Sequence, residues 1–194
     1  MFLMDFYSRL TVKLLLLSAL FLGVMGKTHA DQACTDCHIK VLFKGFYTDE
    51  TCKVSINNAG ETETVILPKI STSALVKEGN EAGSQPFNIS LKECPVSRTV
   101  RVKFLSNLYA ADVNTGNLTN SAGDLYSQNV QVRIRKENSA QVKIDDDVSG
   151  QDYLIPPSGE EVTHTFYASY YASMSSAVTP GIVKTAAGIE LIYK

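Results

Sequence analysis

The amino-acid sequence predicts an all-β protein built as a β-sandwich. Apolar residues recur at every second position in almost every periodic segment, which is typical of half-buried strands. Clusters rich in Asn, Gly, Ser and Asp separate these segments, and no long helical pattern lies between them. Eight or more short strands joined by such turns favour a β-sandwich.

The first 30 residues predict a secretory signal peptide. Arg9 and Lys13 precede an apolar run over residues 14–25, shorter than the roughly 20 residues that span a bilayer. Small residues at Thr28 and Ala30 then match a cleavage site, so we expect cleavage after Ala30. The alternative for this segment is an uncleaved membrane anchor.

The remaining chain, residues 31–194, is long enough for one core but not for two. The full chain has a formal net charge of −2, and removing residues 1–30 makes the chain more acidic. Such a balance gives no electrostatic reason to bind nucleic acid or an anionic membrane. The triplet Asp145-Asp146-Asp147 is either a cation site or a solvated turn, and the turn is the more common outcome.

The expected strands follow one another along the chain, each bounded by turn residues. A short helical turn, capped by Ser71 or Thr72, is expected within residues 71–78. Turn clusters cover residues 57–60, 80–84, 114–123, 145–150 and 156–159. Apolar or packed residues alternate at Ile39/Val41/Phe43, Val54/Ile56, Val65/Leu67, Phe87/Ile89/Leu91, Val100/Val102/Phe104, Val130/Val132/Ile134, Val142/Ile144, Val162/His164/Phe166/Ala168/Tyr170 and Ile189/Leu191/Tyr193.

Four cysteines can oxidise in an exported chain. Cys52 and Cys94 lie beside strand-like runs and are expected to pair, and closing so long a loop contributes about 4 kcal/mol. Cys34 and Cys37 form a Cys-x-x-Cys motif. A redox motif of this kind needs a helix N-terminus in a βαβ unit, which this sequence does not offer. A local disulfide or a bond between subunits is favoured instead.

The C-terminal segment ends in an alternating strand. Ile189, Leu191 and Tyr193 fall on one face of residues 188–194, and Gly181 precedes them. An apolar strand at the end of a chain needs a neighbouring strand. This need indicates assembly rather than catalysis.

Taken in order, these residues resemble those of chaperone–usher pilus subunits, close to the type 1 fimbrial major pilins. The resemblance covers essentially the whole chain after residue 30, and no single part of it is diagnostic. The residues that carry it are Phe43-Lys44-Gly45, Cys52-Lys53-Val54, Leu67-Pro68 with Ile70 and Ser71, Phe87–Leu91 with Cys94, Phe166–Tyr171, and the pair Gly181 and Tyr193.

The resemblance implies an incomplete immunoglobulin-like β-sandwich that lacks its last strand and carries an N-terminal donor-strand extension. It divides the chain into a signal peptide (1–30), the extension (31–46) and a pilin domain (47–194). Cys52 and Cys94 match the single disulfide of the family, whereas Cys34 and Cys37 depart from its pattern. The strand that borders the groove and that the chaperone grips would contain Gly181, Ile189, Leu191 and Tyr193.

The resemblance also implies polymerisation by donor-strand exchange. The donor strand is expected within residues 37–46, with Ile39, Val41 and Phe43 pointing into the groove of the neighbouring subunit. Gly45 would lie where the main chain must come close. Burying three such side chains is worth about 5–9 kcal/mol. The alternative is that this segment forms an ordinary first strand of its own domain.

The implied partners are a periplasmic pilus chaperone, an outer-membrane usher and identical or related pilin subunits, and no nucleic acid is expected. The implied location is a fimbrium on the cell surface, reached through the periplasm, with a role in cell adhesion and biofilm formation. A minor adaptor or tip-proximal pilin of the same system is the main alternative to a major subunit.

Catalysis has little support in the sequence, and we expect no catalytic site, metal or cofactor. Beyond residue 30 the histidines are His38 and His164, and His164 shares the face of a predicted strand with Val162 and Phe166, so a packed side chain is favoured. The residues Tyr167, Tyr170 and Tyr171 suit either a sugar site or a strand, and the strand is favoured. The enzymatic alternative is a thiol-redox protein that uses Cys34 and Cys37.

Overall fold

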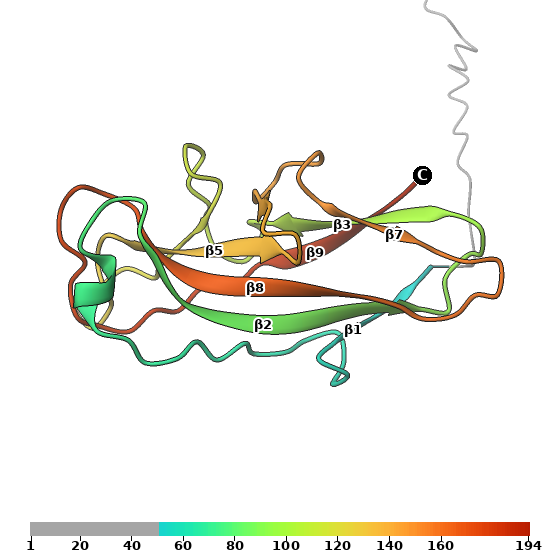
Figure 1. Cartoon of the computed structure of the whole chain (residues 1–194), viewed down its shortest axis with the longest axis horizontal. Coiled ribbons are helices and arrows are strands. Elements are labelled where there is room, and N and C mark those ends of the chain that lie inside the picture. Colours follow the sequence, from blue (N-terminus) through green and yellow to red (C-terminus); the bar gives the residue numbers. More distant parts are fainter. Residues whose placement is uncertain (1–50) are drawn as a thin grey trace, which may run out of the picture. The chain divides into compact units, whose positions relative to one another are not determined.

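The computed structural model describes residues 51–194, which form two facing β-sheets (Figure 1). The signal peptide, the donor segment, Cys34, Cys37 and the boundary at residue 46 lie outside the described residues. The larger sheet has the order β1 (Lys53–Ile56), β2 (Glu81–Lys92), β8 (Val162–Ala172), β5 (Val130–Lys136), β4 (Leu118–Thr119), with β6 (Gln141–Val142) also paired to β5. The smaller sheet has the order β7 (Gln151–Leu154), β3 (Thr99–Leu105), β9 (Gly188–Tyr193).

The all-β prediction is confirmed. Every ladder between named strands is antiparallel, and the predicted alternations lie on the inner faces of the sheets. In β3, for example, Val100 and Val102 are fully buried and Phe104 nearly so, whereas the residues between them are partly exposed. Antiparallel sheets that bury only one face produce this pattern.

Three phenylalanines from both sheets fill the centre of the sandwich. The rings of Phe87 and Phe166, on neighbouring strands of the larger sheet, are stacked with centroids 5.6 Å apart. Phe104 from β3 meets both rings edge-on, at 6.5 Å and 5.4 Å. Such aromatic pairs add roughly 0.5–1.5 kcal/mol each beyond the area they bury.

The expected helical turn is present as η1 (Thr72–Leu75), and the Ser71 hydroxyl caps it by accepting a hydrogen bond from the Ser73 N–H at 3.2 Å. No helix in residues 51–194 is both long enough and apolar enough to cross a membrane.

Several details of the sequence-based assignment were wrong. Residues 81–84 and 118–119 were expected within turn clusters, but they begin β2 and form β4. Val65 and Leu67 were expected to belong to a strand, but their segment pairs with no strand and packs its apolar side chains against the core. The strand β7 was not expected, because only five residues, 151–155, separate the two predicted turn clusters that flank it. Its Tyr153 is fully buried and reaches the larger sheet, where its hydroxyl donates a hydrogen bond to the Ile89 carbonyl at 3.0 Å.

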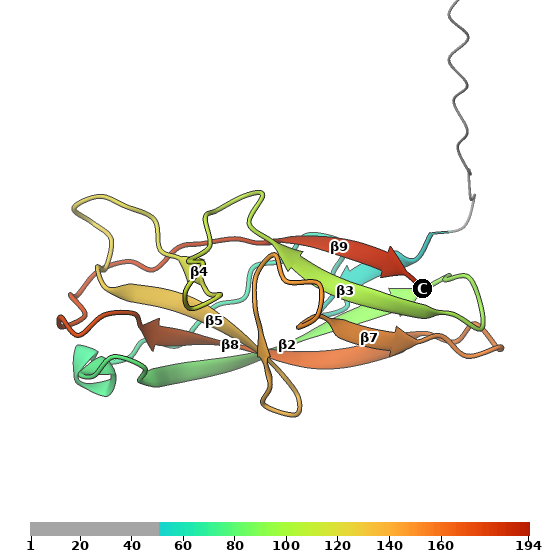
Figure 2. The same cartoon turned by 90° about the horizontal axis from the view of Figure 1, so that it is seen from above.

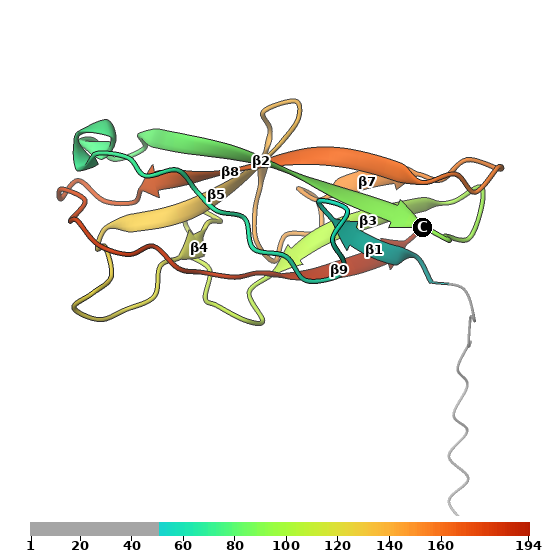
Figure 3. The same cartoon turned by 90° about the horizontal axis from the view of Figure 1, so that it is seen from below.

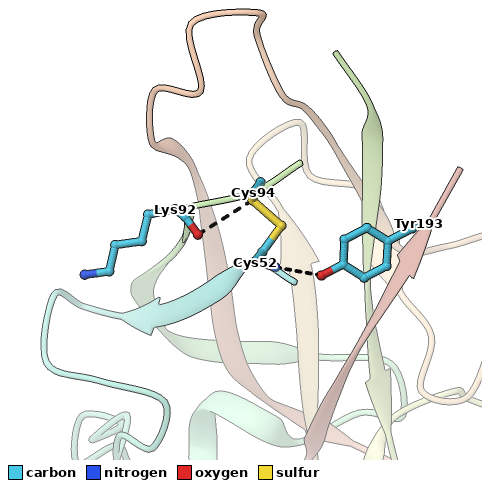
Figure 4. Close-up of a disulfide and its surroundings, with 4 residues drawn as sticks. All are labelled: Cys52, Lys92, Cys94 and Tyr193. Atoms are coloured by element: carbon cyan, nitrogen blue, oxygen red, sulfur yellow. Dashed lines mark hydrogen bonds between the residues drawn. A yellow bond between two sulfur atoms is a disulfide. The ribbon is translucent and has the colours of Figure 1, made fainter. Parts of the chain in front are cut away.

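Cys52 and Cys94 form a disulfide, as expected (Figure 4). The bond joins the residue before β1 to the turn that follows β2. It therefore fixes the start of the described chain to the end of β2, the strand next to the edge strand β1.

Candidate functional site

The strand β9 lies at the edge of the smaller sheet. It pairs with β3 on one side, and no strand of residues 51–194 pairs with its other side (Figure 2). At the edge of the larger sheet lies β1, followed by residues 57–70, which belong to no ladder between named strands. The two sheets are thus left open to each other along one side of the sandwich.

The free edge of β9 presents main-chain groups in a regular order. In an antiparallel strand, successive residues direct their N–H and C=O groups to opposite sides. The Lys194 N–H donates to the Thr99 carbonyl at 2.9 Å, so even-numbered residues face β3. The N–H and C=O groups of Ile189, Leu191 and Tyr193 consequently face the open side.

The segment before β9 continues this edge. Ile182 and Lys184 direct their main-chain groups away from the open side: Ser127 N–H donates to the Ile182 carbonyl at 2.9 Å, and Ser121 N–H donates to the Lys184 carbonyl at 3.0 Å. Asn120 fixes the same stretch, because its Oδ1 accepts from Lys184 N–H at 2.7 Å and its Nδ2 donates to the Ile182 carbonyl at 2.9 Å. The odd-numbered residues from 183 to 193 therefore form one continuous edge.

Two glycines allow this segment to lie close to the rest of the domain. A Cβ at Gly181 would collide with the main chain of Tyr126 and Ser127, and a Cβ at Gly188 would collide with the side chain of Asn107. Close contact with a neighbouring main chain explains Gly181. The sequence had singled out Gly181 from the resemblance but gave no role to Gly188.

A groove of about 560 Å³ opens between this edge and the segment after β1. Figure 3 shows the two segments running along the same side of the sandwich. The groove reaches the core, because the buried residues Phe87 and Phe104 line it. Its walls and floor are mostly apolar and include Val65, Leu67, Leu118, Val132, Ile134, Ala168, Val183, Ala187 and Ile189.

One end of the open side is closed by Tyr193. Its hydroxyl accepts a hydrogen bond from the Cys52 N–H at 2.8 Å (Figure 4). This bond links the smaller sheet to the disulfide at the edge of the larger one. The predicted trio Ile189, Leu191 and Tyr193 is therefore partly buried against the core while its main chain faces outwards.

Thr185 is the one residue with a polar side chain among the odd-numbered residues from 183 to 191. It lines the groove, and its hydroxyl is buried without a hydrogen-bond partner among the described residues. A buried hydroxyl that lacks a partner costs about 1–3 kcal/mol. No signal in the sequence distinguished this threonine from the others.

The outer face of the same edge carries a negative charge at Glu190. Lys103 lies opposite Glu190 in the ladder with β3. Its Nζ is 2.6 Å from Asp147 Oδ1 but 3.4 Å from Glu190 Oε2, so its shorter ion pair is with Asp147. The hydrogen bond to Asp147 raises the pKa of Lys103, with a smaller contribution from Glu190. Because the Glu190 side chain is 48% exposed, its carboxylate remains accessible from the open side.

The other residues considered for chemistry are engaged in packing or local hydrogen bonds. The ring of His164 meets Tyr153 edge-on at 4.6 Å, and burial lowers the pKa of this histidine. Tyr170 donates its hydroxyl to the Pro68 carbonyl at 3.2 Å, and Arg133 lies over the ring of Tyr171 at 3.8 Å. These contacts place His164 and the two tyrosines in the structural framework.

The carboxylates of the acidic triplet each bind a different group. Asp145 accepts from the main chain and hydroxyl of Ser106, Asp146 accepts from the Val148 N–H, and Asp147 pairs with Lys103. Within residues 51–194 no cluster of three metal-ligating side chains is found.

Residues 41–194 match the family described as fimbrial protein. The chain belongs to this family. Among curated proteins, this fimbrial protein is 29% identical over 158 residues to the major fimbrial subunit SMF-1 of Stenotrophomonas maltophilia, which covers 79% of the chain and 90% of the relative.

Two solved structures share the fold of the fimbrial protein. A chain from the structure of a chaperone–usher pilus superposes with a TM-score of 0.55 at 19% identity, covering 81% of this chain and 96% of the other. The P pilus rod subunit PapA superposes with a TM-score of 0.57 at 16% identity, covering 73% and 99%. At such low identities these likenesses concern the fold alone.

Proposed function

We propose that this fimbrial protein is a structural subunit of a chaperone–usher fimbria and polymerises by donor-strand exchange. The observation that carries the proposal is the open side of the sandwich, where an unpaired edge lies beside a groove that reaches the core. In the fibre, the N-terminal extension of one subunit, residues 31–46, occupies the groove of its neighbour.

The groove supplies both kinds of contact that strand addition requires. Its edge offers main-chain groups for a ladder, and its floor offers apolar surface for alternate side chains of the incoming strand. The segment from Ile39 to Phe43 has the matching alternation. Burying Ile39, Val41 and Phe43 contributes about 5–9 kcal/mol, which is comparable to the stability of a small domain.

The same groove must be covered before assembly, because an exposed apolar edge invites aggregation. A periplasmic chaperone that lends a strand would cover it during export, and an outer-membrane usher would exchange that strand for the next subunit. Export of residues 31–194 through the periplasm would then end in a surface fimbrium that supports cell adhesion and biofilm formation. Relatives at 29% identity include both a major fimbrial subunit and a minor fimbrial subunit, so a minor adaptor or tip-proximal pilin of the same system stays the alternative to a major subunit.

The test compares the mature protein with a form that lacks residues 31–46. Both are run on SDS gels before and after boiling, and a synthetic peptide of residues 36–47 is added to the shorter form. We expect SDS-resistant ladders from the longer form only, and an increase in the melting temperature of the shorter form when the peptide is present. If both forms are equally stable monomers and the peptide has no effect, donor-strand exchange is wrong.

A matched pair of variants separates strand insertion from loose association. Val41→Asp places a charge on the inward face of the donor strand and should abolish the ladders, because a charge cannot be buried in an apolar groove. Leu42→Asp places the same charge one residue further on, facing outwards, and should leave most of the ladders intact. Equal loss in both variants would show that the alternation of this segment does not matter.

A further inference from the structure

The side chain of Asn120, just after β4, uses its whole amide group to hold the segment that leads into β9. Its Nδ2 donates to the Ser127 carbonyl at 2.7 Å and to the Ile182 carbonyl at 2.9 Å. Its Oδ1 accepts from the Lys184 N–H at 2.7 Å. A side-chain amide has two donor protons and one acceptor oxygen. All of them bind main chain here, so this side chain takes the place of a neighbouring strand.

The main chain around Asn120 completes the same support. The Lys184 carbonyl accepts from the N–H and the hydroxyl of Ser121, at 3.0 and 2.9 Å. The Ile182 N–H donates to the Leu125 carbonyl at 2.9 Å. The main-chain polar groups of Ile182 and Lys184 therefore all have partners within residues 120–127.

This support determines which main-chain groups of the groove edge stay available. In an extended chain, neighbouring residues direct their N–H and C=O groups to opposite sides. Because residues 182 and 184 bind residues 120–127, the main-chain groups of residues 183 and 185 face the groove. A slip by one residue would exchange the two sets and remove the edge that an incoming strand needs.

The residues that follow have no such support of their own. Within residues 51–194, no hydrogen bond reaches the main chain of residues 185–187, and the ladder with β3 begins only at Gly188. Residues 183–187 nevertheless line the groove without interruption. Asn120 thus supplies the last side-chain hydrogen bonds to this wall before β9 begins (Figure 3).

We propose that Asn120 is a positioning residue for donor-strand uptake, because it holds residues 182–187 in the main-chain orientation that can accept an added strand. The inference rests on the donor-strand function proposed above. Asn120 is not among the residues that line the groove, so it acts through the segment it holds. An incoming strand then meets an edge that is already ordered, which lowers the entropic cost of binding.

The substitution Asn120→Asp distinguishes this role from simple packing. It preserves the shape of the side chain but removes both donor protons, because an ionised carboxylate only accepts hydrogen bonds. The charged oxygen would face the carbonyl oxygens of Ser127 and Ile182, and such a contact is repulsive. Asn120→Asp should therefore release the segment more fully than Asn120→Ala. If the side chain only filled space, the smaller alanine would be the more harmful change.

Assembly of the mature chain, residues 31–194, measures the effect on donor-strand uptake. Isolated monomer is left to assemble, and SDS-resistant ladders are quantified on gels against time. Asn120→Asp should slow ladder formation about fivefold, the effect of losing two partly exposed hydrogen bonds, and Asn120→Ala about twofold. Asn138→Asp is the matched control, because it adds the same charge at an exposed turn and can still accept from the Ala140 N–H. It should leave the rate unchanged.

Hydrogen exchange of the monomeric mature chain, followed at single residues by NMR, locates the change. In Asn120→Asp the amides of Ile182 and Lys184 should exchange about fivefold faster, because their protection depends on the hydrogen bonds around Asn120. The amides in β2, in β8 and in the ladder between β3 and β9 should keep their wild-type rates. A general loss of stability would instead accelerate exchange throughout the domain.

The outcomes separate the positioning role from the function on which it rests. Wild-type ladder formation in Asn120→Asp, or a larger effect of Asn120→Ala, would overturn the role while ladders from wild type uphold donor-strand exchange. If Asn120→Asp does not fold, Asn120→Ala decides: slower ladders with faster exchange at Ile182 and Lys184 support the role, and wild-type behaviour in both overturns it. If wild type forms no ladders, donor-strand exchange fails, and the positioning role fails with it.

Discussion

The two sides of strand β3 are completed in different ways, and two tyrosines show the difference. Val100 lies opposite Tyr153 of β7 on one side and opposite Tyr193 of β9 on the other. Tyr153 is fully buried and donates its hydroxyl to the Ile89 carbonyl of the larger sheet. Tyr193 is partly exposed and accepts from the Cys52 N–H. Both side chains connect the sheets, but only the first closes the space between them.

On the β7 side, the chain itself supplies the side chains that fill the junction. Tyr153 meets His164 edge-on, and Ile155 is buried beside them. On the β9 side, a groove of about 560 Å³ remains between the sheets. One side is thus stabilised by residues already in the domain, whereas the other keeps a groove that a further strand would fill under the proposed function.

The largest expected effect concerns the disulfide, which lies at the end of the open side. Cys52→Ser with Cys94→Ser should lower the free energy of unfolding by about 2–5 kcal/mol, because the loop between them is long and the Cys52 N–H would lose its fixed position near Tyr193. Chemical unfolding followed by circular dichroism measures the loss. Cys34→Ser with Cys37→Ser is the control and should cost much less, and an equal cost would contradict this account.

The two tyrosines give an intermediate effect that tests the comparison directly. Tyr153→Phe should destabilise the domain by about 1–3 kcal/mol, because the buried Ile89 carbonyl loses its hydroxyl donor. Tyr193→Phe should cost about 1 kcal/mol or less, because its surroundings are more exposed to water. Thermal melting of both variants provides the measurement. A larger cost for Tyr193→Phe would show that the open side, and not the closed one, governs the stability of the isolated domain.

The smallest expected effect lies on the larger sheet, away from both tyrosines. Burial acts to raise the pKa of Glu81, but hydrogen bonds from Arg135 and Arg133 outweigh it and leave the pKa below its ordinary value of 4.5. A carboxyl group with a lowered folded-state pKa stabilises the fold above its unfolded pKa. That contribution is lost as the pH falls below about 4.5 towards the folded value.

A Glu81→Gln variant should therefore lose less stability than wild type between pH 5 and strongly acidic pH, as in the general behaviour of paired carboxylates. Chemical unfolding at several pH values gives the free energy of unfolding as a function of pH. The slope of that dependence should be the same whether the groove is empty or filled. A slope that changes when the donor peptide of residues 36–47 binds would link this cluster to the open side.

The alternation of apolar residues was enough to predict β2, β3, β5, β8 and β9, because each buries one face along most of its length. It misassigned Val65 and Leu67, since one-sided burial against a groove produces the same alternation as a ladder. It missed β7, which is too short to show a period.

Some residues of the candidate site could also be predicted from the sequence, and others could not. Ile189, Leu191 and Tyr193 were predicted from their spacing, which is a local property of one strand. The groove floor at Phe87 and Phe104, and the unpaired hydroxyl of Thr185, arise from contacts between segments far apart in the chain. Such contacts leave no periodic signal in the sequence.

The disulfide also determines where mechanical load enters the domain. A pull transmitted along the chain from its N-terminal side reaches Cys52 first and passes through the covalent bond to Cys94, just after β2. The strand β2 has its longest ladder with β8, whose other neighbour is β5. Tension would thus pass into the ladder between β2 and β8 and would not first separate β1 from the edge of the larger sheet. The strands of the larger sheet would therefore resist the force together.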